Sequence, residues 1–262
     1  MQVAVLGCGP AGLLAAHALK RNNHEPIILS KKVKSTIFGA QYLHRPIPGI
    51  TSETPDFNVH VWKIGTKEGY AEKVYGDRNA EVSWDSFHPG EYAAWDMRQA
   101  YDKLWEMYDS QIFEAPINGA GDVIHLMENY PVIFCSIPRN LMCRGGHEFK
   151  GQPIQVLHGH SDDSPAMNEM IYNGSEGEET DPTWYRFSNI NGYRAWEYRE
   201  GQARTVYGGD RYQLSLGIKP LSNKCDCWPS LQRIGRFGKW EKGELTHHAF
   251  EDADIISSVV EG

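Results

Sequence analysis

The stretch QVAVLGCGPAGLLAAHALKR, residues 2–21, decides the fold. Its apolar start at 2–6 predicts a short buried strand, and the Ala- and Leu-rich run at 11–21 predicts an amphipathic helix. The segment PIILS at 26–30 predicts the next strand. Strand, glycine turn, helix and strand in this order are typical of the β-α-β unit that binds one half of a dinucleotide, so we expect an α/β fold.

The turn between the first strand and the helix carries the pattern G-x-G-x-x-G. Gly7 permits the tight turn, Gly9 lets the backbone approach a pyrophosphate, and Gly12 lets helix and strand pack closely. Pro10 and Ala11 open the helix, whose unpaired N–H groups and positive dipole end favour phosphate. Because the pattern follows a strand and begins a helix, we interpret it as a dinucleotide site.

The end of the second strand departs from this pattern. An Asp or Glu is expected there to hold the ribose hydroxyls, but the chain has Ser30, Lys31 and Lys32. Ser30 is a candidate for a weaker ribose hydrogen bond. The two lysines fit either a 2′-phosphate, which would indicate NADP, or an ordinary solvated surface. On this motif alone the dinucleotide stays open.

Composition limits the functional classes. The chain has 262 residues, a net charge of -8 and a mean hydropathy that predicts solubility, and no apolar run approaches the ~20 residues of a membrane span. The acidic balance argues against a broad phosphate-binding surface. Five cysteines at uneven spacing, without an export signal, indicate reduced thiols and a cytoplasmic location.

Hydrophobic periodicity predicts the remaining elements. Strands are expected at 57–64, 80–84, 111–114, 130–137, 153–158, 184–198, 203–207 and 231–237, and helices at 92–108 and 245–260.

Five segments resemble the FAD family that includes amine oxidases, protoporphyrinogen oxidase and UDP-galactopyranose mutase. They are GCGPAGL at 7–13, GAQYLH at 39–44, VIFCSIPRNLM at 132–142, WYRFSNI at 184–190 and IGRFGKW at 234–240. The resemblance implies FAD rather than NAD(P). It also implies an FAD-binding Rossmann-like domain from 1–50, 111–150 and 225–262, with a reduced, mainly antiparallel β substrate subdomain from 51–110 and 151–224.

The same resemblance implies which residues meet the cofactor. Ile137 and Pro138 would lie beside the adenosine half, and Gly235 with Arg236 would meet the pyrophosphate. The small-residue turn Gly39, Ala40 and Gln41 would lie against the isoalloxazine ring. Leu245 and Thr246 would lead into a helix whose N-terminus points at the flavin.

Catalytic candidates follow from these positions. His247 and His248 open the last helix, and one of them is a candidate proton donor or substrate contact, although neighbours on a helix do not share a face. Gln41 and His44 are candidates for orienting the substrate, and Tyr42 is more simply packing. Tyr185 and Arg186 fit a clamp for a substrate carboxylate or phosphate, or a strand with one exposed face.

No metal is expected. Cys225 and Cys227 supply at most two ligands, and no C-x-x-C partner occurs elsewhere. His158, His160, Asp162 and Asp163 are more simply a solvent-exposed turn. The aromatic helix 92–108 is interpreted as core.

The function expected from the resemblance is an FAD-dependent oxidoreductase that oxidises a carbon–nitrogen bond of an amine or amino-acid group. The segment GAQYLHRPIPG at 39–49 also resembles short phage-encoded flavoproteins of thymidine hypermodification. That narrower resemblance implies a glycine-type adduct on DNA as substrate, glyoxylate as product and the host cytoplasm as location. Lys31, Lys32, Lys34, Arg45 and residues 233–242 are the candidates for DNA contact.

Two alternatives stay open. One is a redox-neutral or NAD(P)H-reduced flavoenzyme acting on a small soluble metabolite. The other is a flavin-binding module without turnover, which the substrate-domain segments disfavour. The oligomeric state is left undetermined, and molecular oxygen is the default electron acceptor because no second G-x-G-x-x-G pattern occurs.

Overall fold

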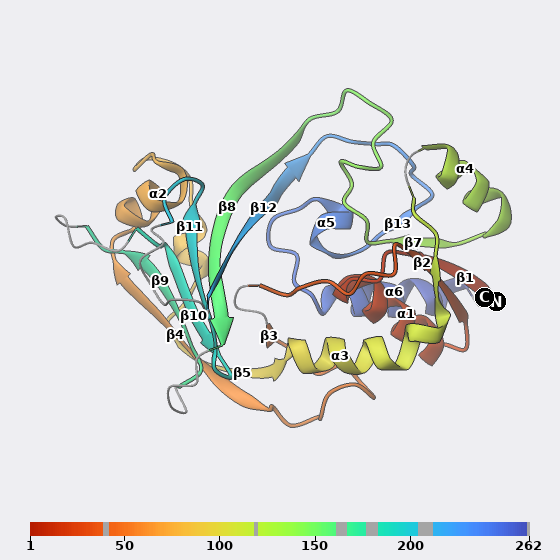
Figure 1. Cartoon of the computed structure of the whole chain (residues 1–262), viewed down its shortest axis with the longest axis horizontal. Helices are drawn as coiled ribbons and strands as arrows, with labels where there is room; N and C mark the ends of the chain where they lie inside the picture. Colours follow the sequence, from red (N-terminus) through yellow and green to blue (C-terminus); the bar gives the residue numbers. More distant parts are fainter. Residues whose placement is uncertain (39–41, 118–119, 161–166, 177–182, 204–211, 261–262) are drawn as a thin grey trace.

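The glycine-turn segment forms the centre of a parallel sheet. The computed structural model describes residues 1–38, 42–117, 120–160, 167–176, 183–203 and 212–260. In this part of the chain the sheet has the order β13-β7-β1-β2-β6, and all its pairings are parallel (Figure 1). Its strands are β1 (Gln2–Leu6), β2 (Glu25–Ser30), β6 (Ile112–Glu114), β7 (Ile133–Cys135) and β13 (Gln232–Arg233).

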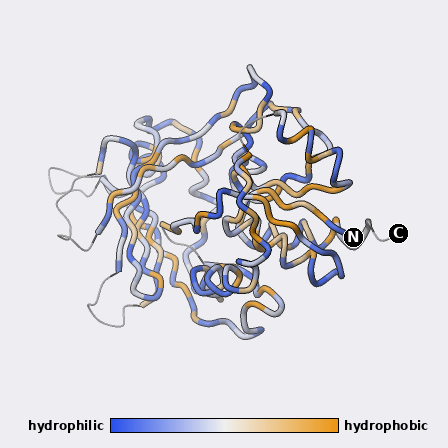
Figure 2. Tube along the Cα trace, turned by 45° about the vertical axis from the view of Figure 1, so that its right-hand side comes forward, coloured by the Kyte–Doolittle hydropathy of each residue, from blue (hydrophilic) through white to orange (hydrophobic). Residues whose placement is uncertain are grey.

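Alternation along β1 explains how helices cover both faces of this sheet. Val3 and Val5 belong to one core cluster with the helices α1, α3 and α6, whereas Ala4 and Leu6 belong to another with α4. The helices are α1 (Pro10–Arg21), α3 (Met97–Tyr108), α4 (Ala120–Asn129) and α6 (His248–Val260). In Figure 2 the hydrophobic residues follow these central strands.

A second, larger sheet lies beside this unit, on the left in Figure 1. Its order is β12-β8-β11-β10-β9-β4-β5-β3, and every pairing is antiparallel except β4 with β9. The strands are β3 (Tyr42–Leu43), β4 (Phe57–Gly65), β5 (Gly90–Asp96), β8 (Phe149–His160), β9 (Glu169–Gly174), β10 (Arg186–Ile190), β11 (Tyr193–Arg199) and β12 (Gln213–Asn223).

Helix α2 (Lys67–Tyr75) packs on one face of this sheet through Tyr70 and Val74. It begins at Thr66, whose side chain accepts a hydrogen bond from the Gly69 N–H. The short helical turns are Ser83–Ser86, Asp109–Gln111 and α5 (Gly235–Lys239).

The α/β fold class is confirmed, and three predicted elements are wrong. Residues 92–96 belong to β5, not to a helix, because Asp96 accepts hydrogen bonds from the N–H groups of Arg98 and Gln99 and so caps α3 at Met97. Residues 80–84 do not form a strand, since a helical turn begins at Ser83. Within 231–237 only Gln232–Arg233 is strand.

Other differences concern subdivision. The predicted strand 184–198 is two strands, joined by a turn at Asn191 and Gly192 with φ of 49° and 77°. The predicted last helix begins at His248 instead of 245. Residues 204–207 lie outside the described residues.

The domain division stays a prediction, although one helix is informative about it. Helix α3 falls in the segment 51–110, yet Tyr101 and Leu104 share the core cluster of the parallel sheet. Among the described residues, no helix has the length and apolarity needed to cross a membrane.

Candidate dinucleotide and substrate site

The three glycines of the turn meet different surroundings. A Cβ on Gly12 would lie 1.9 Å from the carbonyl oxygen of Gly7, and one on Gly7 would lie 2.5 Å from Ser136 Oγ. Gly7 also has φ of +98°, which favours glycine. At Gly9 the nearest atom to an added Cβ is Ser35 Oγ at 3.6 Å. Packing therefore requires two of the glycines, whereas a Cβ at Gly9, beside the N-terminus of α1, would make only an ordinary van der Waals contact.

A tyrosine from α3 holds this turn in place. The Tyr101 hydroxyl donates to the Cys8 carbonyl at 3.0 Å and accepts from the Ser35 N–H at 3.0 Å. Ser30, the candidate ribose ligand, ends β2 beside the turn and donates to Cys8 Sγ at 3.0 Å. The sequence interpretation missed Tyr101, because an aromatic residue on an amphipathic helix is equally expected in the core.

The segment that follows β7 is hydrogen-bonded to the end of β1, just before the glycine turn. The Ser136 N–H and hydroxyl both donate to the Leu6 carbonyl at 2.9 Å. Ile137, which follows it, lies under Gly7, where an added Cβ would be 3.6 Å from its side chain. Ile137 is therefore next to the glycine turn, and the contact of Ile137 and Pro138 with the adenosine half stays a prediction.

The C-terminal glycine segment meets the same turn. Gly235 has φ of +67°, and a Cβ on it would lie 2.5 Å from the Cβ of Ala11. Gly238 approaches the carbonyl oxygen of Cys135 equally closely, at 2.4 Å from an added Cβ. The segment Gly235–Lys239 is thus in contact with the N-terminus of α1.

Arg236 lies between this contact and the large sheet. Its Nε is buried and has no hydrogen-bond partner among the described residues. Burial and the charge of Arg186 lower the pKa of Arg236. Arg236 therefore lies near Arg186, a residue of β10, as well as near the glycine turn.

Arg186 belongs to a compact charge cluster on the large sheet. The Glu197 carboxylate accepts from both Arg186 and Lys219, and Lys219 also donates to the Tyr185 hydroxyl at 3.2 Å. Although burial opposes ionisation, Arg186 and Lys219 lower the pKa of Glu197 to about 2. Burial, partly offset by Glu197, lowers the pKa of Lys219 to about 8. With Arg236 the cluster holds three cations and one anion.

The two residues of the predicted substrate clamp differ. Arg186 is partly exposed, whereas Tyr185 is only 1% exposed and packs edge-on against Tyr70. The sequence interpretation missed Glu197 and Lys219, which come from strands that pair only in the fold.

Four aromatic side chains form a row from β3 to the last helix. The ring of His44 lies 4.6 Å from Tyr42 and 5.9 Å from His247, and His247 lies 4.6 Å from His248. At the β3 end of the row, burial raises the pKa of the Tyr42 hydroxyl, and the charge of Arg186 partly opposes that rise. The structure therefore brings His44 and His247 together, and the contact of either segment with the flavin stays a prediction.

The two histidines have different surroundings. His247 is 3% exposed, and burial together with His248 and His44 lowers its pKa to about 4. Its Nδ1 has no partner among the described residues. His248 instead lies 3.6 Å from Glu244 and accepts from the Leu245 N–H. The carbonyl of Thr246, the other predicted cofactor residue here, accepts from the Ala249 N–H.

Several predicted residues stay unplaced or have other roles. Gly39, Ala40, Gln41, Asp162 and Asp163 lie outside the described residues. His158 is a buried residue of β8, not part of an exposed turn, and its ring nitrogens lie 2.5 Å and 2.7 Å from the hydroxyls of Tyr193 and Ser215.

The basic residues suggested for DNA contact are mostly paired. Lys32, Lys34 and Arg45 form ion pairs with Asp109, Asp102 and Glu251, in that order, and Lys239 pairs with Glu244 and Asp252. Lys31 is exposed at the end of β2.

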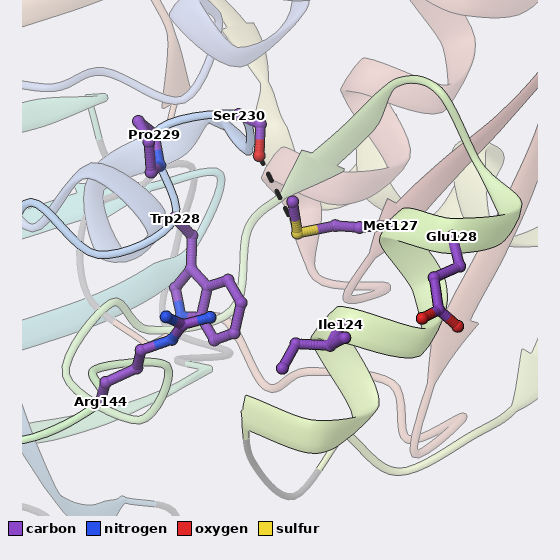
Figure 3. Close-up of a pocket in the computed structure, with 7 residues that line it drawn as sticks. All are labelled: Ile124, Met127, Glu128, Arg144, Trp228, Pro229 and Ser230. Atoms are coloured by element: carbon purple, nitrogen blue, oxygen red, sulfur yellow. Dashed lines mark hydrogen bonds between the residues drawn. The ribbon is translucent and has the colours of Figure 1, made fainter.

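Two surface cavities lie away from these residues. One, of about 370 Å³, is lined by α4 and by Arg144, Trp228, Pro229 and Ser230 (Figure 3). The other, of about 420 Å³, lies between α2 and the ends of β8, β11 and β12. Neither contains a predicted site residue.

Comparison with known proteins finds similarity in structure only. No protein-family profile matches the sequence, and no curated protein matches it. The fold resembles CtdE in complex with FAD (TM-score 0.54, 11% identity, 98% of this chain and 84% of that one). It also resembles RebC with reduced flavin (0.55, 9%, 100% and 61%). A third similar structure is the R204Q form of HpxO from Klebsiella pneumoniae complexed with FAD (0.52, 10%, 99% and 81%). The chain therefore has the fold of these flavin-bound proteins.

Proposed function

We propose that the protein is an FAD-dependent oxidoreductase whose parallel sheet and helices form a Rossmann-like FAD-binding domain. The observation that carries this proposal is the contact of Gly235 with Ala11, which brings the C-terminal glycine segment to the phosphate-binding turn. An NAD(P) site built on the first motif alone does not require that contact. The fold of the FAD-bound proteins supports the same cofactor.

The residues present fit this cofactor. The uncrowded backbone at Gly9 and the N-terminus of α1 suit a pyrophosphate, and Ser30, which lies beside Cys8 of the turn, would meet the ribose. Ile137 and Pro138 would meet the adenosine half. Lys31 would stay a solvated side chain, while Leu245, Thr246 and the unmatched Nδ1 of His247 would face the flavin end.

The substrate we propose is an amine that carries a carboxylate, such as an N-substituted amino acid. Arg186 and Lys219 share the single Glu197 carboxylate, which leaves Arg186 with charge for a substrate carboxylate, while Arg236 stays the candidate for the pyrophosphate. The lowered pKa values of His247 and His44 keep both imidazoles uncharged at neutral pH, so neither repels a cationic amine and each can accept a hydrogen bond from an amine N–H group.

When bound, FAD supplies a two-electron hydride acceptor that molecular oxygen reoxidises. Loss of hydride from the carbon next to nitrogen, together with loss of the N–H proton to solvent, turns the substrate into an imine. Water then splits the imine into a carbonyl product and a free amine. For a glycine adduct these products are glyoxylate and the amine left on the parent molecule, which is formally a lyase outcome.

The most specific part of the proposal is the molecule that carries the amine group. A thymine in phage DNA rests on the resemblance of residues 39–49 alone. Because Lys32, Lys34 and Arg45 are already paired with carboxylates, the structure favours a soluble amino-acid substrate over duplex DNA.

Monooxygenation is the second candidate, and the fold favours it. One similar structure is a peptidyl tryptophan dihydroxylase, QhpG (TM-score 0.52, 10% identity, 99% of this chain and 66% of that one). A hydroxylase needs an external reductant such as NADPH before oxygen reacts, whereas an amine oxidase takes electrons from its substrate.

One anaerobic experiment distinguishes amine oxidation, monooxygenation and a flavin-binding module without turnover. The purified protein should be yellow and should release FAD on denaturation. Bleaching by an N-alkyl glycine without NADPH, lost in Arg186→Gln, supports amine oxidation. Bleaching by NADPH alone would replace it with monooxygenation, and retention of colour with both reductants would indicate a flavin-binding module. Colourless protein that FAD cannot reconstitute would overturn the cofactor assignment.

A further inference from the structure

Two long connections join the parallel sheet to the large sheet, and they run side by side. One follows β7 and leads to β8, and the other follows β12 and leads to β13 (Figure 1). Arg139 of the first donates to the Cys225 carbonyl of the second, and Trp228 Nε1 donates to the Met142 carbonyl at 2.7 Å. The Arg144 guanidinium carbon lies 3.7 Å from the centroid of the Trp228 ring. Figure 3 shows the two side chains lying against each other.

Four metal-ligating side chains meet where these connections touch. They are Cys143 and His147 from the first, and Cys225 and Cys227 from the second. Their ligand atoms all lie within 4.8 Å of one another. Sequence spacing alone found only the last two, because the other pair comes from a distant segment of the chain.

We propose that Cys143, His147, Cys225 and Cys227 bind one zinc ion in tetrahedral coordination and so tie the two connections together. Three thiolates and one imidazole are an ordinary ligand set for structural zinc. The soft thiolates disfavour calcium and magnesium, which prefer oxygen ligands.

The distances in the cluster agree with a tetrahedral site. Zn–S bonds of about 2.3 Å and Zn–N bonds of about 2.0 Å put the sulfur and nitrogen atoms of neighbouring ligands about 3.5 Å apart. The His147 Nδ1 lies 3.2 Å from Cys143 Sγ and 3.6 Å from Cys227 Sγ. Both contacts are within a few tenths of an ångström of that spacing.

The surroundings hold the ligands in a suitable form. The Asp226 carboxylate lies 3.3 Å from His147 Nε2, so it favours a proton on Nε2 and leaves the lone pair of Nδ1 toward the sulfurs. The N–H groups of Gly145 and Arg144 lie 3.4 Å and 3.5 Å from Cys143 Sγ and Cys227 Sγ. Backbone donors of this kind stabilise sulfur that carries negative charge.

The site is separate from the proposed oxidoreductase function, since its four ligands are not among the residues expected to meet FAD or the substrate. Its effect on the fold would still reach that site. The Arg139 N–H donates to the Phe237 carbonyl at 2.9 Å, so the clamped connections adjoin the segment that carries Gly235.

Metal content is the direct test. The reduced full-length protein is stripped with a chelator, supplied with Zn²⁺, desalted and analysed by elemental analysis. We expect one zinc per chain, and less than a tenth of that in Cys143→Ser and in His147→Ala. Cys135→Ala and His125→Ala are the matched controls, because these residues lie outside the cluster, and they should keep the metal.

X-ray absorption of the zinc-loaded wild-type protein tests the ligand set without any variant. Three sulfurs at about 2.3 Å and one nitrogen at about 2.0 Å are expected. The proposal is overturned if the wild type takes up no zinc, if the zinc has an oxygen- or nitrogen-only environment, or if mass mapping of the protein isolated without reductant and never metal-stripped shows a disulfide among the three cysteines.

Discussion

Gly235 lies against Ala11 so closely that a single added methyl group would overlap it, at 2.5 Å from Cβ to Cβ. These residues come from opposite ends of the chain. Their contact joins the first residue of α5 to the first turn of α1, where the unpaired N–H groups of the helix lie. Any ligand held by those N–H groups is therefore also next to the C-terminal segment.

Replacing Gly235 by alanine should separate the two segments. The left-handed φ of +67° adds about 1 kcal/mol of strain, and the clash with Ala11 adds more. We expect FAD content to fall at least tenfold and the Tm to fall, measured by absorbance and thermal unfolding. Gly243→Ala is the matched control, with φ of +84° and nothing within 4 Å of the new Cβ. Equal FAD loss in both variants would contradict the role of the contact.

Alanine substitutions at Gly12 and Gly9 of the first turn should have different effects, one on folding and the other on FAD binding. Gly12→Ala puts a Cβ 1.9 Å from a backbone oxygen, so it should unfold the protein or lower its Tm sharply. Gly9→Ala meets nothing closer than 3.6 Å and should fold normally, yet lose FAD because the Cβ occupies the phosphate approach. Circular dichroism and flavin absorbance measured on the same samples separate the two effects. Normal FAD content in Gly9→Ala would be evidence against a pyrophosphate there.

Structural features set by residues that are close together in the sequence could be predicted, whereas features set by contacts between distant segments could not. The β-α-β unit follows from residues 2–30, because a short apolar strand, a glycine turn and an Ala-rich helix each have a local pattern. The predicted helix 92–108 was wrong over its first five residues for a related reason. Its apolar spacing also fits a strand, and only the Asp96 cap and the pairing of β5 with β4 decide the boundary.

The candidate site was less predictable, because its polar groups come from strands that pair only in the fold. Glu197 joins Arg186 and Lys219 from two other strands, and no spacing in the sequence relates the three. His44 and His247 were proposed on resemblance, and the structure brings them together. The cluster of Cys143 with Cys227 was missed, since neither segment alone has a metal-binding pattern.

Removing the Tyr101 hydroxyl should loosen the glycine turn. Tyr101→Phe leaves the Cys8 carbonyl and the Ser35 N–H without their partner, at a cost of about 1–3 kcal/mol. FAD binding should weaken as well, measured by titration of the apoprotein. Tyr108→Phe, on the same helix, removes a hydrogen bond to His17 and should lower stability without weakening FAD. If the two variants bind FAD alike, Tyr101 is only a core residue.

Neutralising Glu197 should be costly. It is 3% exposed, and Glu197→Gln leaves Arg186 and Lys219, which are mostly buried, without their counter-charge, which typically costs about 3–5 kcal/mol. Denaturant unfolding measures the loss. Glu176→Gln breaks an exposed pair with Arg78 and should cost no more than about 1 kcal/mol. A similar small cost at Glu197 would show that its two cations are well solvated.

The lowered pKa of His247 predicts a specific dependence of stability on pH. The unfolded histidine takes up a proton near pH 6.5, whereas the folded one does so only near pH 4. Between these values the unfolded state binds more protons, so the free energy of unfolding falls as the pH is lowered through this window. The full difference corresponds to about 3 kcal/mol at about 1.4 kcal/mol per pH unit.

His247→Gln should flatten the decline between pH 6.5 and 4, measured by urea unfolding. His125→Gln, at an exposed position on α4, should leave it unchanged. Because burial also lowers the pKa values of His17 and His44, part of the decline should remain in His247→Gln. An identical pH profile in the wild type and in His247→Gln would mean that His247 is open to water in solution, and it would remove the basis for a neutral imidazole at the flavin end of the site.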